Sequence, residues 1–202
     1  MYLCAMNATD TRERILQSMF IDIRRNGFQG LRADKVVAEL GITKGALYHY
    51  FDSKQSIGKA VIDEIIKPNY LLFYHELDRS EGNPIPMLAG HLKYLSDMTT
   101  DEDIVLGCPL NNLIQEMSPL DEDFRLRMRN IVEGIQESVA SALQRGKAGG
   151  FIREDVDCKA VGRFFLSTIE GSYSMAKVSK DKEAFVANMG LLTAYLESLA
   201  VP

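Results

Sequence analysis

The sequence predicts an all-α protein: two observations support this fold class, and composition and length show that the chain can bury a core. Apolar residues recur with helical spacing along most of the chain, and the sequence lacks sustained period-two alternation bounded by hairpin turns. The composition, 46% hydrophobic and 25% charged, is typical of a globular protein that can bury a core. A chain of 202 residues has room for one large domain or two small ones.

Three short-range patterns predict the first helices. The first helix should run from Asp10 or Thr11 to Asn26-Gly27, because glycine favours a helix end. Its apolar face comprises Ile15, Leu16, Met19, Phe20 and Ile23. A second helix is expected at about Ala33 to Leu40, where Gly41 stops it, and Thr43 can cap a third over Lys44 to Tyr50.

The remaining helices follow from caps, breakers and periodicity. Asp52 or Ser53 can cap a fourth helix toward Lys67, and Pro68 predicts a break or kink because it cannot donate a backbone hydrogen bond. Asn69 to Leu77 should be helical again, before a loop over 80–84. Later helices are expected at about Ile85 to Met98, Cys108 to Met117, Leu120 to Arg145, Asp157 to Ala176 and Lys182 to Leu199, with Asp157 and Asp181 as N-caps.

The second and third helices, joined by a turn that contains Gly41, have the plan of a helix-turn-helix. At about 100° per residue, Leu47, Tyr50 and Phe51 share one apolar face of the third helix, so we expect them in the core. Gly45, Tyr48 and His49 point the other way, with Lys44 and Ala46 on the flanks. This face has little bulk at its start and carries polar groups, which suits approach to a DNA groove.

The run from Gly41 to Lys54, Gly-Ile-Thr-Lys-Gly-Ala-Leu-Tyr-His-Tyr-Phe-Asp-Ser-Lys, resembles the recognition-helix signature of the TetR family of bacterial transcriptional regulators. About 50 residues, from Thr11 to Asp63, fit the family closely, whereas the rest fits by helix number and length. The resemblance implies an N-terminal DNA-binding domain, here residues 1–52, and a helical regulatory and dimerisation domain, residues 53–202. The helix over about 53–67 would connect them.

The resemblance also implies a function and a set of DNA contacts. It implies a homodimeric repressor that binds a palindromic operator in double-stranded DNA and is released by a small-molecule effector. The residues that match the family's DNA-contacting positions are Thr43, Lys44, Gly45, Ala46, Tyr48, His49 and Lys54. Leu31 and Arg32 stand where the family often has hydroxyl residues that cap the second helix, and Asp34 is a possible substitute.

An apolar seam on the last helix and a broader apolar arc on the helix before it predict a dimer interface. Positions 185, 189, 192, 196 and 199 step by four, three, four and three, the spacing that one helix offers to another. In the family the last two helices of each subunit form the dimer, and the alternative is that the seam packs within one chain. The predicted interface residues are Phe164, Phe165, Phe185, Met189, Leu192, Leu196 and Leu199.

The middle helices should enclose an effector pocket, although core packing is the alternative for each residue. The predicted lining residues are Tyr94, Met98, Cys108, Asn112, Gln115 and Tyr173. Pro109 favours the first position of a helix, so Cys108 should sit at its N-cap, where the helix dipole stabilises a thiolate. Some family members sense electrophiles or oxidants through a cysteine; the alternative is a small buried residue in a tight turn.

Charge and motif content exclude several function classes and leave two rivals. Net charge is −5, but residues 1–67 hold ten basic against eight acidic residues, which suits one end facing a polyanion. We expect no metal, cofactor or catalytic site, because close His or Cys spacings and catalytic motifs are missing. Three scattered cysteines and no membrane-length apolar stretch predict a cytoplasmic protein. The rivals are a cysteine-dependent helical enzyme and a protein-binding scaffold with a vestigial helix-turn-helix.

Overall fold

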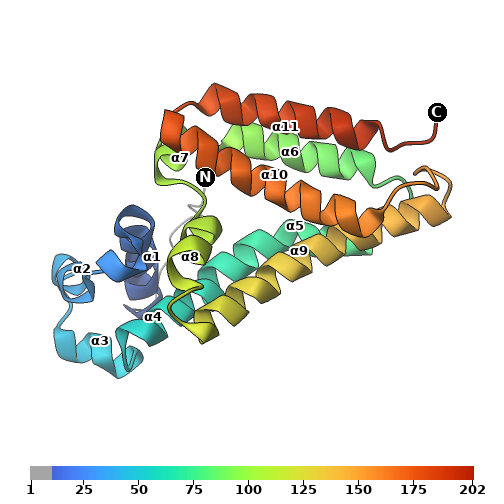
Figure 1. Cartoon of the computed structure of the whole chain (residues 1–202). Helices are drawn as coiled ribbons and strands as arrows, with labels where there is room; N and C mark the ends of the chain where they lie inside the picture. Colours follow the sequence, from blue (N-terminus) through green and yellow to red (C-terminus); the bar gives the residue numbers. More distant parts are fainter. Residues whose placement is uncertain (1–10) are drawn as a thin grey trace. The chain divides into compact units, whose positions relative to one another are not determined.

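The computed structural model describes residues 11–202, and its regular elements in this range are helices (Figure 1). The only bridge between extended residues in this range joins Ile152 and Ala200. This confirms the predicted all-α class. Asp10 and Cys4 lie outside the described residues. The chain divides into two compact units: the first comprises the chain up to Asn69 with Pro109–Arg129, and the second comprises Tyr70–Cys108 with Asn130–Pro202.

The first unit is built on α1, Thr11–Gly30, whose predicted apolar face is buried as expected. Gly27 interrupts this helix with φ 74° and ψ 167°, values in a region that only glycine adopts readily. The helix therefore bends where the sequence predicted its end, and a further turn continues to Gly30. α8, Pro109–Met117, packs against α1 within this unit.

The helix-turn-helix consists of α2, Ala33–Glu39, and α3, Lys44–Tyr50. Gly41 has φ 69° and ends the first of these helices, as predicted. Thr43 caps α3 by accepting a hydrogen bond from the Ala46 N–H at 3.2 Å, also as predicted. Arg32 precedes α2 without a side-chain cap, so Asp34 does not take the capping role proposed for it.

The helix continues through Pro68 without the predicted break, but its turns change from α to π just before the proline. α4, Lys54–Ala60, begins at a capping box between Ser53 and Ser56 and passes into a π-helical segment, η1, Val61–Ile66. α5, Lys67–Arg79, follows without a break. Pro68 donates no backbone hydrogen bond, but the π turns before it, where the Lys67 N–H pairs with the Ile62 carbonyl, let the helix continue past the proline ring.

The second unit packs α11, Lys182–Glu197, against α6, Ile85–Met98, and α10, Cys158–Ser179 (Figure 1). Asp157 and Asp181 cap α10 and α11, as predicted. α9, Glu122–Ala148, is fixed to the end of α5 by the Arg145 guanidinium, which donates to the Leu77 carbonyl at 2.7 Å. These helices bury the apolar core of the unit.

A short helix, α7, Asp101–Leu106, was not predicted from the sequence. Its start is a capping box: the Thr100 hydroxyl accepts from the Asp103 N–H, and the Asp103 carboxylate accepts from the Thr100 N–H. Thr-x-x-Asp resembles the known Thr-x-x-Glu pattern, which would have revealed this helix.

Candidate nucleic-acid interface and effector site

The exposed side of α3 carries the side chains predicted to meet DNA. Leu47 is fully buried and anchors the helix, which turns Gly45, Tyr48 and His49 outward. Tyr48 is 46% exposed, although its aromatic ring would favour burial. The Thr43 cap fixes the start of this helix, so these groups project from a rigid element.

Lys44 already has a partner within the helix-turn-helix. Its ammonium donates to the Asp34 carboxylate of α2 at 2.8 Å and lies 5.8 Å from the centre of the Tyr48 ring. This hydrogen bond raises the pKa of Lys44 above its ordinary value, because the Asp34 carboxylate stabilises the charged ammonium. Lys44 could bind a DNA phosphate by replacing its hydrogen bond to the Asp34 carboxylate with one to a phosphate oxygen.

Tyr50 is the one predicted core residue of α3 that is not buried. It is 37% exposed and meets the His49 ring edge to face, with ring centroids 5.2 Å apart. α3 ends at this residue, and Phe51 adopts extended backbone angles that direct its own side chain inward. Helical periodicity, on which the prediction rested, no longer applies at the last turn.

Lys54 begins α4 and points back at the end of α1. Its ammonium donates to the Gln29 carbonyl at 2.8 Å and lies 5.3 Å from the centre of the Phe28 ring. Lysine has three N–H donors, so one bond to a carbonyl leaves others for a phosphate.

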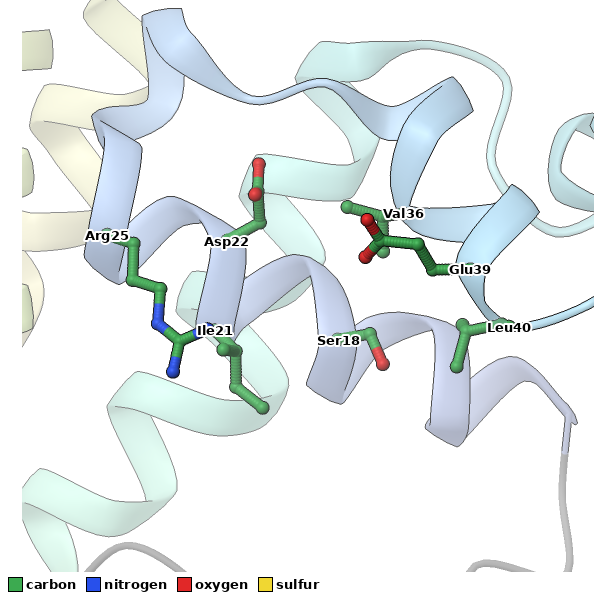
Figure 2. A pocket seen from close by; sticks show the side chains of 7 residues that line it. All are labelled: Ser18, Ile21, Asp22, Arg25, Val36, Glu39 and Leu40. Atoms are coloured by element: carbon green, nitrogen blue, oxygen red, sulfur yellow. The ribbon is translucent and has the colours of Figure 1, made fainter.

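A surface hollow in the first unit lies between α1 and α2 (Figure 2). Asp22 and Glu39 bring acidic groups to its wall, which does not favour an anionic ligand. None of the predicted effector residues lines it. Its lining residues are Ser18, Ile21, Asp22, Arg25, Val36, Glu39 and Leu40.

Cys108 directly precedes Pro109, the first residue of α8, as the sequence predicted. The thiol is buried, and its sulfur lies 2.9 Å from the Tyr70 hydroxyl. It also forms a hydrogen bond with the Glu170 carboxyl of α10, and burial raises the pKa of this acid to about 7. Sequence reasoning missed Tyr70 and Glu170; an isolated acid in the apolar stretch Phe164–Ser172 was the available signal.

The other predicted effector residues belong to both units and differ in exposure. Tyr173 is half-buried, with its hydroxyl 2.8 Å from the Thr99 hydroxyl and its ring against Phe185. Met98 and Asn112 are also half-buried, whereas Tyr94 and Gln115 are exposed. Tyr173 lies one helical turn from Glu170 on α10.

The predicted dimer seam is core within one chain. Phe165, Phe185, Met189, Leu192, Leu196 and Leu199 are all buried in the second unit. The alternative considered from the sequence, packing within one chain, accounts for their spacing, because α11 presents that face to α6 and α10. Phe164 is different: it is 48% exposed, and its ring contacts that of Tyr195 edge to face with centroids 5.0 Å apart.

Two family models match the chain. The model for the N-terminal region of "Bacterial regulatory proteins, tetR family" matches residues 23–61, and "Tetracyclin repressor-like, C-terminal domain" matches residues 84–190, more than half of the chain. The chain belongs to the TetR family of bacterial transcriptional regulators. The family resemblance predicted from α3 is thereby confirmed.

Relatives of this TetR-family chain include named repressors. It is 28% identical over 193 residues to an uncharacterised HTH-type transcriptional regulator of Lactococcus lactis, covering 96% of each chain. The repressor DhaR of Mycobacterium sp. (strain GP1) is 21% identical, with 88% of each chain covered. The repressor NemR of Escherichia coli is 25% identical over 138 residues, covering 68% of this chain and 69% of NemR.

Solved structures share the fold of this TetR-family protein. A TetR transcriptional regulator of Chloroflexus aurantiacus matches with a TM-score of 0.81 at 22% identity, covering 94% of this chain and 96% of its own. The reduced form of E. coli NemR matches with a TM-score of 0.76, also at 22% identity, covering 95% and 98%. Between Thr11 and Pro202, no helix is long and apolar enough to cross a membrane. The same range contains no cluster of three potential metal ligands.

Proposed function

We propose that this TetR-family regulator is a repressor that binds a palindromic operator as a homodimer and is released by a small molecule or an electrophile. The observation that carries the proposal is the exposed side of α3, where Tyr48 and His49 project beside Lys44. The named repressors among the relatives support it. Selection of bound sequences from genomic DNA, followed by release with candidate metabolites, tests it. Turnover of an electrophile without DNA binding would favour the enzyme alternative.

The recognition surface gives a pair of substitutions with opposite expected signs. Lys44→Ala removes a phosphate contact, so operator binding should weaken and the salt slope, d log K/d log[salt], should fall in magnitude by about one. Asp34→Asn frees the same ammonium from its internal carboxylate, so binding should tighten.

Tyr48→Ala should weaken operator binding without reducing thermal stability, because the side chain is exposed. Titrations at several salt concentrations measure all three; equal affinities for the two charge variants would contradict the assignment.

Homodimerisation requires an exposed apolar face, and α10 and α11 provide one. Phe164, Met175 and Val178 lie on one side of α10 and are 48%, 65% and 83% exposed. Leu191 and Tyr195, one turn apart on α11, continue this face through the Phe164–Tyr195 ring contact. We define these five residues as the outer face. Exposed apolar side chains at helical spacing are typical of a helix that meets another helix.

Gly171 supports a close helix partner at the outer face. It lies between Phe164 and Met175 on the same side of α10, and an added Cβ would meet nothing within 4 Å. Glycine inside a helix costs about 1 kcal/mol relative to alanine, so a lone chain gains nothing from it. A second helix that approaches the backbone at this position would use the space.

The effector is proposed to act near Cys108, Glu170 and Tyr173, either by reversible binding or by thiol modification. Labelling with a maleimide separates these routes. If Cys108 is the sensor, it should react faster than Cys158, whose thiol pKa is raised mainly by burial. The variant Cys108→Ser should then keep operator binding but lose release by electrophiles. Labelling of Cys108 no faster than Cys158, with unchanged release in the variant, would leave reversible binding as the route.

A further inference from the structure

A carboxylate from α8 clamps the bend near the end of α1. The Glu116 Oε2 atom accepts from the Phe28 N–H at 2.9 Å, and Oε1 accepts from the Gln29 N–H at 2.6 Å. Both N–H groups follow directly after Gly27, where the helix is interrupted and its backbone donors lack their usual acceptors. A Cβ added at Gly27 would lie 2.9 Å from Oε2, so the carboxylate fills the space that glycine leaves.

The two clamped residues are the ones that hold Lys54. The Gln29 carbonyl accepts from the Lys54 ammonium at 2.8 Å, and the Phe28 ring lies 5.3 Å from the same nitrogen. Phe28 is fixed in turn by the Phe124 ring, with centroids 4.8 Å apart, and an added Cβ at Gly58 would meet both rings at 2.5 Å. Glu116 therefore fixes the backbone of Phe28 and Gln29, and these two residues in turn fix the position of the Lys54 ammonium.

We propose that Glu116 is a positioning residue for operator binding: by clamping Phe28 and Gln29 it holds Lys54 where the ammonium meets a DNA phosphate. The proposal rests on the proposed function. One donor of Lys54 is used by Gln29 and others stay available for phosphate oxygens. α8, which carries Glu116, starts directly after Cys108.

Net charge alone predicts that replacing Glu116 by glutamine should tighten operator binding, whereas the proposal predicts weaker binding. Glu116→Gln removes a negative charge, which by itself should strengthen binding to a polyanion. Under the proposal the substitution weakens binding instead, because the glutamine amide offers one acceptor oxygen and directs its NH₂ at a backbone donor. Operator affinity should fall on the order of tenfold, as for one lost charged contact, and the salt slope should fall by about one.

The experiment measures operator affinity against salt for the wild-type protein and four variants, the first of which is Glu116→Gln. Glu122→Gln is the matched control: it removes an exposed carboxylate that bonds Arg125 and should leave affinity unchanged or slightly higher. Lys54→Met removes the ammonium itself. If Glu116 acts through Lys54, the double variant Glu116→Gln with Lys54→Met should bind no more weakly than Lys54→Met alone.

Three results would overturn the proposal. They are unchanged or tighter binding by Glu116→Gln, additive effects in the double variant, and amides of Phe28 and Gln29 that exchange with solvent as slowly in Glu116→Gln as in the wild type. Gly27→Ala, which forces a Cβ against the same carboxylate, provides a second route to the same loss if Glu116→Gln folds poorly. A wild-type protein that binds no DNA would instead refute the proposed function, whatever the amides show.

Discussion

Leu191→Glu is expected to give a folded monomer that no longer holds the operator. Leu191 is 70% exposed on the outer face of α10 and α11, so the free chain tolerates the substitution. In a dimer that buries this face, the glutamate would be an unpaired charge in apolar surroundings, and the cost is about 3 to 5 kcal/mol per buried copy. Two copies in a symmetric interface double the effect. Sedimentation and circular dichroism, followed by operator titration, measure the outcome.

The neighbouring residue provides the control for the Leu191 substitution. Leu192 is 2% exposed and packs inside the second unit, so Leu192→Glu should unfold that unit rather than separate two folded chains. The two substitutions differ by one position and introduce the same charge. A Leu191→Glu protein that sediments as a dimer would show that the outer face is not the interface.

Local sequence features predicted the fold well, because caps and breakers act on their immediate neighbours. The bounds of α6 match the predicted Ile85 to Met98, and Thr43, Asp157 and Asp181 cap the helices assigned to them. α7 was missed although its capping box, Thr100 with Asp103, can be read from the sequence. At Pro68 the sequence showed that an α-helical hydrogen bond was lost, but not that π turns would replace it.

The candidate site was predicted only where it is local. The exposed side of α3 follows from periodicity within seven residues, whereas the Glu116 clamp joins residues 87 and 88 positions apart. Periodicity also identified the buried seam of α11 but could not say which chain buries it. Phe185 and Leu192 are buried in their own chain, where α11 packs against α6 and α10, whereas Leu191 of the proposed interface is exposed.

Gly162→Ala is expected to cause the largest loss of stability among small substitutions in the second unit. An added Cβ would lie 2.5 Å from the Gln136 carbonyl oxygen and 3.4 Å from the Ala140 nitrogen. Both are backbone atoms of α9, which cannot move aside by a side-chain rotation. α9 and α10 must therefore separate to admit the methyl group. Such overpacking costs about 1 to 3 kcal/mol or more, which lowers the melting temperature by roughly 2 to 12 °C for a chain of this size.

Gly171→Ala is the matched control on the same helix. Its Cβ would enter open space, so the higher helix propensity of alanine should stabilise the single chain by up to about 1 kcal/mol. Both substitutions should be compared in the Leu191→Glu background, where dimerisation does not contribute to the melting temperature. In the wild-type background, Gly171→Ala should weaken the dimer, because the added methyl group keeps a partner helix away. A Gly162→Ala protein as stable as its parent would show that α9 and α10 do not approach this closely.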